Sequence, residues 1–156
     1  MLKRAVLVVA LGGLFLFPTH DRIVSAAADN PLQGVWQVMD VGGQPVAGVY
    51  IFTGKHYSIM FATTDRPQID DTSKTTADEL RAMWGPMAAN AGTYDVSGNL
   101  VTIRPIVAKI PVVMKPGAND VYAFRVEGNI LSFTQQRNAR GVTVQNAATT
   151  RLMRVE

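Results

Sequence analysis

Short apolar segments separated by tight turns are the feature that most constrains the fold of this chain. The turns are polar and carry glycine: Gly42-Gly43-Gln44-Pro45, Thr53-Gly54-Lys55, Ser97-Gly98-Asn99 and Glu127-Gly128-Asn129. Glycine in such turns permits a positive φ, and the flanking segments are rich in β-branched and aromatic residues, which favour strands. The pattern predicts strands over 34–40, 46–52, 56–61, 92–96, 100–110, 120–126, 130–136 and 149–155.

Eight short strands joined by hairpins favour an all-β fold, namely an eight-stranded up-and-down antiparallel β-barrel. The interior of such a barrel is just wide enough for packed side chains or for one small ligand. Trp36, on the first strand, is expected at its closed end. Pro105 within the fifth segment requires an edge position, a bulge or a bend. An open sandwich of two sheets is the main alternative.

One helix is expected between strands three and four. Thr76 and Glu79 form a capping box, the signature of a helix N-terminus. Behind it, apolar residues recur at helical spacing. They are Leu80, Met83, Trp84, Met87, Ala88 and Ala91. Gly85-Pro86 interrupts this stripe, so a kink or two short helices are predicted over 76–90. We expect the stripe to lie on the open end of the barrel and to gate it.

The N-terminus has the three parts of a secretory signal. Lys3 and Arg4 precede an uncharged apolar run over 5–17, and small residues over 25–28 offer a cleavage site. The run of about 13 residues is short for a spanning helix, which needs roughly 20. The sequence therefore predicts a signal peptide over 1–28 and a single exported barrel domain over 29–156, periplasmic or secreted, without stable membrane insertion. An uncleaved anchor is the alternative.

Charge and composition exclude several classes of function. The formal charge of +3 falls to +1 without residues 1–28, and the remaining cations are scattered, so no nucleic-acid partner is expected. The chain has no cysteine, and His56 is the single histidine after residue 28. A metal site or a Ser-His-Asp triad therefore has few residues to use, and neither a metal nor a cofactor is expected. His56 is expected to face solvent at the start of its strand.

Aromatic and thioether side chains could line an apolar pocket in the barrel. Those considered are Tyr57, Met60, Met83, Trp84, Tyr94, Met114, Tyr122 and Phe124. Arg66, next to Asp65 in the loop after the third strand, could hold a ligand carboxylate or form a local ion pair that shapes the loop. Arg104 is expected to point outward, because Val101 and Ile103 make the opposite face of its strand the more apolar one.

The motifs along the chain resemble a known family. Gly34-Val35-Trp36 resembles the Gly-x-Trp signature that opens the lipocalins, and Asn119-Asp120-Val121-Tyr122 loosely resembles their second signature region. Arg151 or Arg154 could be the arginine that packs over the tryptophan in that family. The resemblance is closer to the bacterial lipocalin-like domain, through Tyr57-Ser58, Arg66-Pro67, a helix over 79–87 and Ala89-Asn90-Ala91-Gly92-Thr93-Tyr94. It covers the chain from about Leu32 to Arg154, although a typical lipocalin places its helix after the last strand.

Three functions are open at this point. The resemblance implies an exported, non-catalytic carrier or sequestering protein that binds a small, largely apolar molecule inside the barrel. The alternative is a small-barrel enzyme of the isomerase, cyclase or decarboxylase type that uses Tyr57, Asp65, Arg66 or Tyr94 in a dry cavity. The third is a barrel filled by its own side chains that binds protein on an outer face. No catalytic residue is assigned, and the carrier is favoured.

Overall fold

The computed structural model describes residues 30–62 and 65–156, and its strands form one antiparallel sheet. The strands are β1 Gly34–Val41, β2 Gln44–Pro45, β3 Ala47–Phe52, β4 His56–Ala62, β5 Met87–Ser97, β6 Leu100–Ala108, β7 Asp120–Glu127, β8 Ile130–Arg137 and β9 Thr149–Arg154. The helix is α1 Ala77–Trp84, and the short 3₁₀ turns are η1 Thr72–Lys74 and η2 Pro111–Met114. The predicted signal peptide lies outside the described residues.

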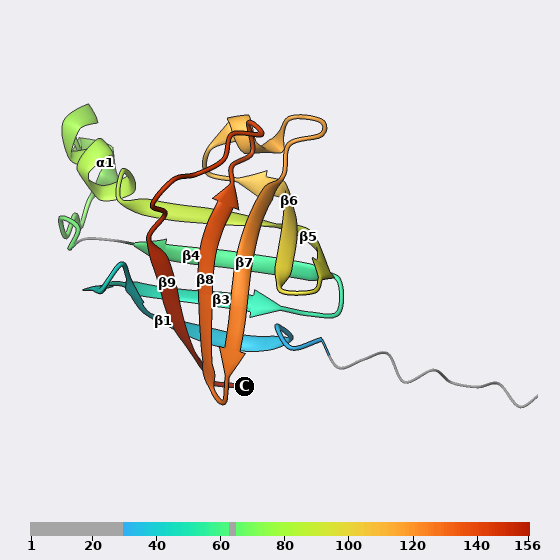
Figure 1. Ribbon diagram of the computed structural model, residues 1–156. Helices are drawn as coiled ribbons and strands as arrows, with labels where there is room; N and C mark the ends of the chain where they lie inside the picture. The colour runs from blue at the N-terminus through green and yellow to red at the C-terminus, as the bar shows by residue number, and fades with distance from the viewer. Residues whose placement is uncertain (1–29, 63–64) are drawn as a thin grey trace, which may run out of the picture.

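The sheet closes into a barrel. From β3 to β9 each strand pairs with the next along the chain, and β1 pairs with both β3 and β9. The two-residue β2 pairs with β1 alone, beside the ring of eight strands. Figure 1 shows β3, β4 and β5 crossing behind β7, β8 and β9 at a steep angle. The predicted eight-stranded up-and-down barrel is therefore confirmed, and an open sandwich is excluded because β1 and β9 join.

Strand alternation separates the interior from the outer surface. In β1, Trp36, Val38 and Asp40 are buried, whereas Gln37 and Met39 are exposed. In β6, Val101 and Ile103 are buried and Arg104 is exposed, as predicted. His56 is exposed at the start of β4, also as predicted. The period of two thus identifies the inward face of each of these strands.

Aromatic rings contribute much of the interior. The rings of Tyr122 and Phe133 stack with centroids 4.5 Å apart, and Phe52 meets Tyr94 edge-on at 5.3 Å. Such offset and edge-on pairs are the favoured aromatic geometries. The buried core residues are Leu32, Trp36, Val38, Tyr50, Phe52, Tyr57, Ile59, Tyr94, Val101, Ile103, Phe124, Leu131, Phe133 and Leu152.

The proline in β6 sits at a bulge. Pro105 pairs with Gly92 of β5, and the register shifts between Ala91 and Gly92. A Cβ atom at Gly92 would lie 2.0 Å from the carbonyl oxygen of Arg104, so only glycine fits this close approach of two backbones. The sequence prediction of a bulge, bend or edge at Pro105 is met by this bulge.

The helix is shorter than predicted. The capping box forms as expected, with the Thr76 hydroxyl accepting from the Glu79 amide and the Glu79 carboxylate accepting from the Thr76 amide. The helix ends at Trp84, and Met87, at the far side of Gly85-Pro86, begins β5. The predicted helix over 76–90 is wrong there because β5 pairs with β4 from Met87 to Thr93, and these ladder bonds replace helical ones. Counting the short β2, the helix lies between β4 and β5 rather than between strands three and four.

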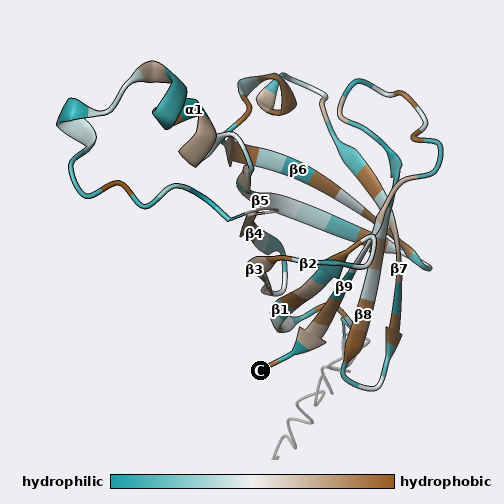
Figure 2. Ribbon diagram, turned by 90° about the vertical axis from the view of Figure 1, so that its left-hand side faces the viewer, coloured by the Kyte–Doolittle hydropathy of each residue, from teal (hydrophilic) through white to brown (hydrophobic). Residues whose placement is uncertain are grey.

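The helix does not cover the barrel. None of its residues is buried, and Trp84 is 51% exposed. Figures 1 and 2 show α1 projecting away from the strands. Its C-terminal end is held by Lys109, whose ammonium donates to the carbonyl oxygens of Trp84, of Gly85 at 3.0 Å and of Met87 at 2.7 Å. The expectation that the apolar stripe packs on the open end is therefore wrong.

Candidate functional site

One end of the barrel interior is capped around Trp36. The indole Nε1 donates to the carbonyl oxygen of Leu32 at 2.7 Å, and both side chains are fully buried. The guanidinium of Arg154 lies over the indole, 4.1 Å from the ring centroid, a cation–π geometry. Its two terminal nitrogens donate to the carbonyl oxygens of Gln33 at 2.6 Å and Pro31 at 2.9 Å. Arg154 thus joins the last strand, β9, to the segment that precedes β1, residues 30–33, which we call the incoming segment.

Arg151, the other candidate for this position, has a different role. Its Nε and Nη2 atoms contact the Asp40 carboxylate at 2.8 and 2.7 Å. The hydrogen bond from Arg151 lowers the pKa of Asp40, so the pair stays ionised. Gly34 belongs to the cap because its φ is +135° and a Cβ there would lie 2.4 Å from the carbonyl oxygen of Glu156. The predicted signature residues therefore divide between a cap (Gly34, Trp36, Arg154) and a neighbouring ion pair.

A second interior region carries polar side chains, which we call the inner polar cluster. Strand pairing directs each of them inward. Asn90 pairs with the buried Ile59, and Asp120 pairs with the buried Ile103. Paired residues share a face of the sheet. The cluster comprises Tyr57, Asn90, Asp120, Tyr122 and Gln135.

Two polar atoms of this cluster have no hydrogen-bond partner among the described residues. They are the Tyr57 hydroxyl and the Asn90 side-chain oxygen, and both are buried. Burying a polar group without a partner costs about 1–3 kcal/mol. Native interiors satisfy nearly all such atoms. The cluster is therefore unlike the cap, where the indole nitrogen and the guanidinium are hydrogen-bonded.

Burial disfavours the charged form of the acid in this cluster, Asp120. Asp120 is 8% exposed, and burial raises its pKa above the ordinary value even though Gln135 Nε2 donates to it at 2.9 Å and the Ala139 amide donates as well. Burial is also the main cause of the raised pKa of the Tyr57 and Tyr122 hydroxyls, and the Asp120 charge adds to it. These groups act on one another in a medium of low polarity, where hydrogen bonds and charges interact strongly.

Some of the predicted ligand-binding residues come together in the interior. Tyr57 and Tyr122 belong to the inner polar cluster, and Phe124 lies in the core beside Phe133 of the next strand. Tyr94 also points inward, but its hydroxyl is engaged, since it donates to the Thr53 carbonyl oxygen at 2.5 Å and accepts from Asn30. Tyr94 therefore secures the incoming segment rather than presenting a free polar group.

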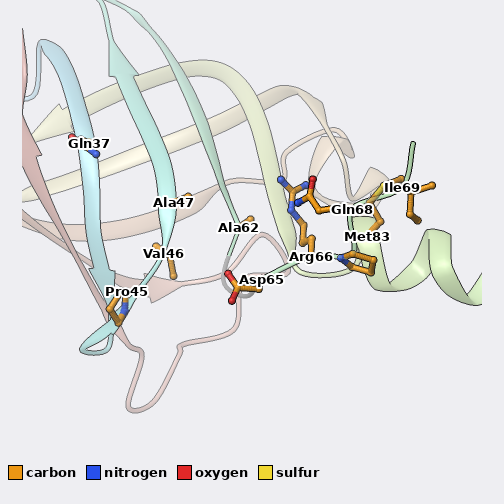
Figure 3. A pocket seen from close by; sticks show the side chains of 11 residues that line it. Gln37, Pro45, Val46, Ala47, Ala62, Asp65, Arg66, Gln68, Ile69 and Met83 are labelled. Carbon is orange, nitrogen blue, oxygen red and sulfur yellow. The ribbon is translucent and has the colours of Figure 1, made fainter. Parts of the chain in front are cut away.

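Other predicted ligand-binding residues lie outside the barrel. Met60 is 47% exposed because it follows the inward Ile59 by one residue, so its prediction as an interior residue is wrong. Trp84 is exposed on α1. Arg66 and Met83 line an external recess of about 850 Å³ between the strand ends and the loop after β4. Figure 3 shows its side chains spread along these segments, with Gln37 and Pro45 far from Arg66 and Met83.

Of the two interpretations of Asp65-Arg66, the local ion pair is not formed, and the contact of Arg66 with a ligand carboxylate stays a prediction. In the described part of the chain Arg66 makes no ion pair with Asp65, and its Nη1 atom lies 3.9 Å from the Met87 sulfur. Both residues are exposed. An exposed arginine retains its hydration, so it offers weaker recognition than a buried one.

Sequence reasoning missed Asn90, Asp120 and Gln135 as site residues. The alternation of β7 could have identified Asp120, because it precedes the inward Tyr122 and Phe124 at a spacing of two. A bulge between Val121 and Tyr122 perturbs that pattern, so the spacing alone is ambiguous. Asn90 was missed because the apolar stripe at helical spacing placed it in the predicted helix over 76–90, whereas it lies in β5.

Within the residues that the structure describes, no group of three or more His, Asp or Glu side chains is placed to hold a metal ion. No helix in this part of the chain is both long and apolar enough to cross a membrane. No protein-family model matches the sequence, and no curated protein is significantly similar to it.

Proposed function

We propose that this protein is an exported carrier or sequestering protein that binds a small, largely apolar molecule inside the barrel. The proposal of export rests on the basic, apolar and small-residue segments over 1–28. The proposal of a carrier rests on the closed barrel and on the resemblance to the bacterial lipocalin-like domain. In this proposal the inner polar cluster orients the ligand, and the surrounding aromatic rings enclose its apolar part.

The observation that carries the proposal is the pair of buried polar atoms that lack a hydrogen-bond partner within residues 30–62 and 65–156, the Tyr57 hydroxyl and the Asn90 oxygen. A hydroxyl can donate and an amide oxygen can accept, so a ligand with an alcohol or a carboxylic acid group can form a hydrogen bond with either atom. A ligand that completes these bonds recovers the cost of leaving them unmade. Its affinity would also draw on buried apolar surface, at about 25 cal/mol per Å².

The test is native mass spectrometry of the full-length protein expressed in bacteria and purified without denaturation. A co-purifying small molecule, released when the protein is unfolded, is the expected result. The same protein is then titrated with the fluorescent probe 1-anilinonaphthalene-8-sulfonate, with Tyr57→Phe and Asn90→Leu as variants. The co-purified molecule is then added to displace the probe. Its affinity for each variant is expected to be about tenfold weaker than for the wild type, the effect of one lost buried hydrogen bond.

Met60→Leu is the matched control, because Met60 lies on β4 as Tyr57 does but on the outer face. It should bind like the wild type. A protein with no bound mass and no saturable probe binding would overturn the carrier proposal. Equal binding by all variants would place the ligand elsewhere.

The alternative function is a small-barrel enzyme, and one observation favours it. Asp120 is a buried acid with a raised pKa beside two tyrosines, and such groups are typical of acid–base catalysis. In this alternative Asp120 exchanges a proton with the bound molecule, in place of the Asp65 and Arg66 considered from sequence. The test is recovery of the co-purified molecule in a chemically changed form after incubation. Asp120→Asn should abolish the change while the molecule still binds.

A further inference from the structure

A recess of about 510 Å³ lies between the loop after η2 and the loop after β8. Both loops lie at the end of the barrel away from the C-terminus (Figure 1). Three cationic side chains line it: Lys115, Arg137 and Arg140. Its other lining residues are Val112, Pro116, Gly117, Ala118, Asn119, Ala139 and Gly141. We call it the cationic recess.

In the described part of the chain, no carboxylate lines this recess. Within the described residues, Lys115, Arg137 and Arg140 form no ion pair, whereas Arg81, Arg104, Arg125 and Arg151 each do. Three like charges around one recess repel one another, and an anion between them would relieve that repulsion.

The loops that form the recess are shaped by their own hydrogen bonds. Asn138 Oδ1 accepts from the amides of Arg140 at 3.0 Å and Val142 at 3.2 Å. Arg137 Nη2 donates to Asn119 Oδ1 at 3.0 Å, which joins the two loops across the recess. The cations are therefore carried by a constrained frame, and a site that is already formed loses less entropy on binding.

The recess adjoins the inner polar cluster. Asn119 lines the recess, and the next residue, Asp120, faces the barrel interior. Ala139 lines the recess, and its amide donates to the Asp120 carboxylate. A short stretch of backbone thus separates the two regions. A ligand whose apolar part lies among the interior rings could place a charged end here.

We propose that the cationic recess binds an anionic group, a carboxylate or a phosphate, at one end of the ligand. This inference rests on the proposed carrier function and narrows the ligand to an anionic amphiphile. Guanidinium groups bind these planar or tetrahedral anions through charge-assisted hydrogen bonds, which are stronger than neutral ones. The site does not require the anion to enter the low-polarity interior, where its desolvation would be costly.

The test compares dodecanoate with dodecanol, which share an apolar chain and differ in charge, by calorimetric titration of the full-length protein at low salt. Dodecanoate is expected to bind about tenfold more tightly, the effect of one charge-assisted hydrogen bond. The preference should disappear in Lys115→Gln/Arg140→Gln, which keeps the Arg137–Asn119 bond. Lys55→Gln/Lys74→Gln is the matched control, since it removes the same charge from exposed lysines outside the recess and should keep the preference.

A second arm titrates inorganic phosphate and follows the backbone amide resonances of both loops by NMR. Phosphate should shift the Lys115–Asn119 and Asn138–Gly141 resonances in the wild type and not in the double variant. Equal affinity for dodecanoate and dodecanol, with no phosphate shifts, would overturn the anion site and leave the carrier proposal standing. Phosphate shifts without binding of either chain would support a site for free anions and overturn the carrier proposal.

Discussion

The cap around Trp36 and the inner polar cluster around Tyr57 lie in the same barrel but differ in how fully their polar atoms are hydrogen-bonded. In the cap, the indole nitrogen donates to Leu32 and the Arg154 guanidinium donates to two further carbonyls. In the cluster, the Tyr57 hydroxyl and the Asn90 oxygen have no partner among the described residues, and burial raises the pKa of Asp120. The cap thus adds to stability, whereas the unpaired atoms of the cluster lower it, and under the proposed function a ligand would supply the missing bonds.

The largest expected effect is at the centre of the cap. Trp36→Ala should lower the free energy of unfolding by about 3–5 kcal/mol, because it removes a fully buried ring and opens a cavity. Urea denaturation followed by circular dichroism measures the loss. Trp84→Ala is the control, since Trp84 is 51% exposed and its removal should change stability by about 0.5 kcal/mol or less. Similar losses for the two variants would contradict the assignment of Trp36 to the core.

A smaller loss is expected at the arginine of the cap. Arg154→Ala should lower the free energy of unfolding by about 1–2 kcal/mol, because it removes a cation–π contact and two hydrogen bonds to the incoming segment. Arg125→Ala serves as the comparison, since Arg125 pairs with Glu127 on the surface, where an ion pair contributes little. Hydrogen exchange of the Leu32 and Gln33 amides should rise in Arg154→Ala alone.

The same substitution should have opposite effects at two inward tyrosines. Tyr94→Phe removes the bond to the Thr53 carbonyl oxygen and should cost about 1 kcal/mol. Tyr57→Phe removes a hydroxyl that has no partner in the described part of the chain, so the free energy of unfolding should stay the same or rise by up to about 1 kcal/mol. Thermal and urea unfolding of the apo protein measure both. A loss at Tyr57 as large as that at Tyr94 would show that the Tyr57 hydroxyl is hydrogen-bonded.

The smallest effect is expected at Asp120 and depends on pH. Its pKa is raised in the folded protein, so the unfolded chain releases this proton first as the pH rises from the ordinary value of 3.8. The contribution of Asp120 to stability should therefore fall as the pH rises above that value. Asp120→Asn removes this dependence while its side-chain oxygen can still accept from Gln135. The stability of the variant relative to the wild type should rise as the pH rises above 3.8, measured in urea titrations. A gain that grows toward acid pH would contradict the raised pKa.

Most of the strands could be predicted from the sequence because their signals are local. Glycine turns separate β7 from β8 and β5 from β6, and alternation in β6 identified Val101 and Ile103 as inward residues. The capping box at Thr76 was equally local, since both of its bonds lie within one helical turn. These features depend on residues that are near one another in the chain.

The errors lie where distant segments compete with local preference. Met87, Ala88 and Ala91 continue a helical stripe, yet they belong to β5 because β4 pairs with them along the whole segment. Met60 was expected inside because it is apolar, whereas the register of β4 with β3 and β5 turns it outward. The register of β4 with β5 also turns Asn90 inward. The prediction of a helix over this segment therefore missed a site residue.

The candidate site could be predicted only in part. Tyr57 and Tyr122 were identified from their residue type, but Asp120 and Gln135 become neighbours only when β7 and β8 pair. The cationic recess likewise joins residues from two loops, which are linked by the Arg137–Asn119 bond.

The sequence by itself determined the barrel, its turns and the tryptophan at its capped end, because turn chemistry, alternation and the Gly34-Val35-Trp36 segment are encoded within a few residues. Only the tertiary structure decided that Arg154 rather than Arg151 covers Trp36, that α1 stands apart from the barrel, and that two interior polar atoms have no partner among the residues it describes. The reason is that these outcomes depend on the register between strands far apart in the chain, and a shift of one residue would reverse the inward and outward faces.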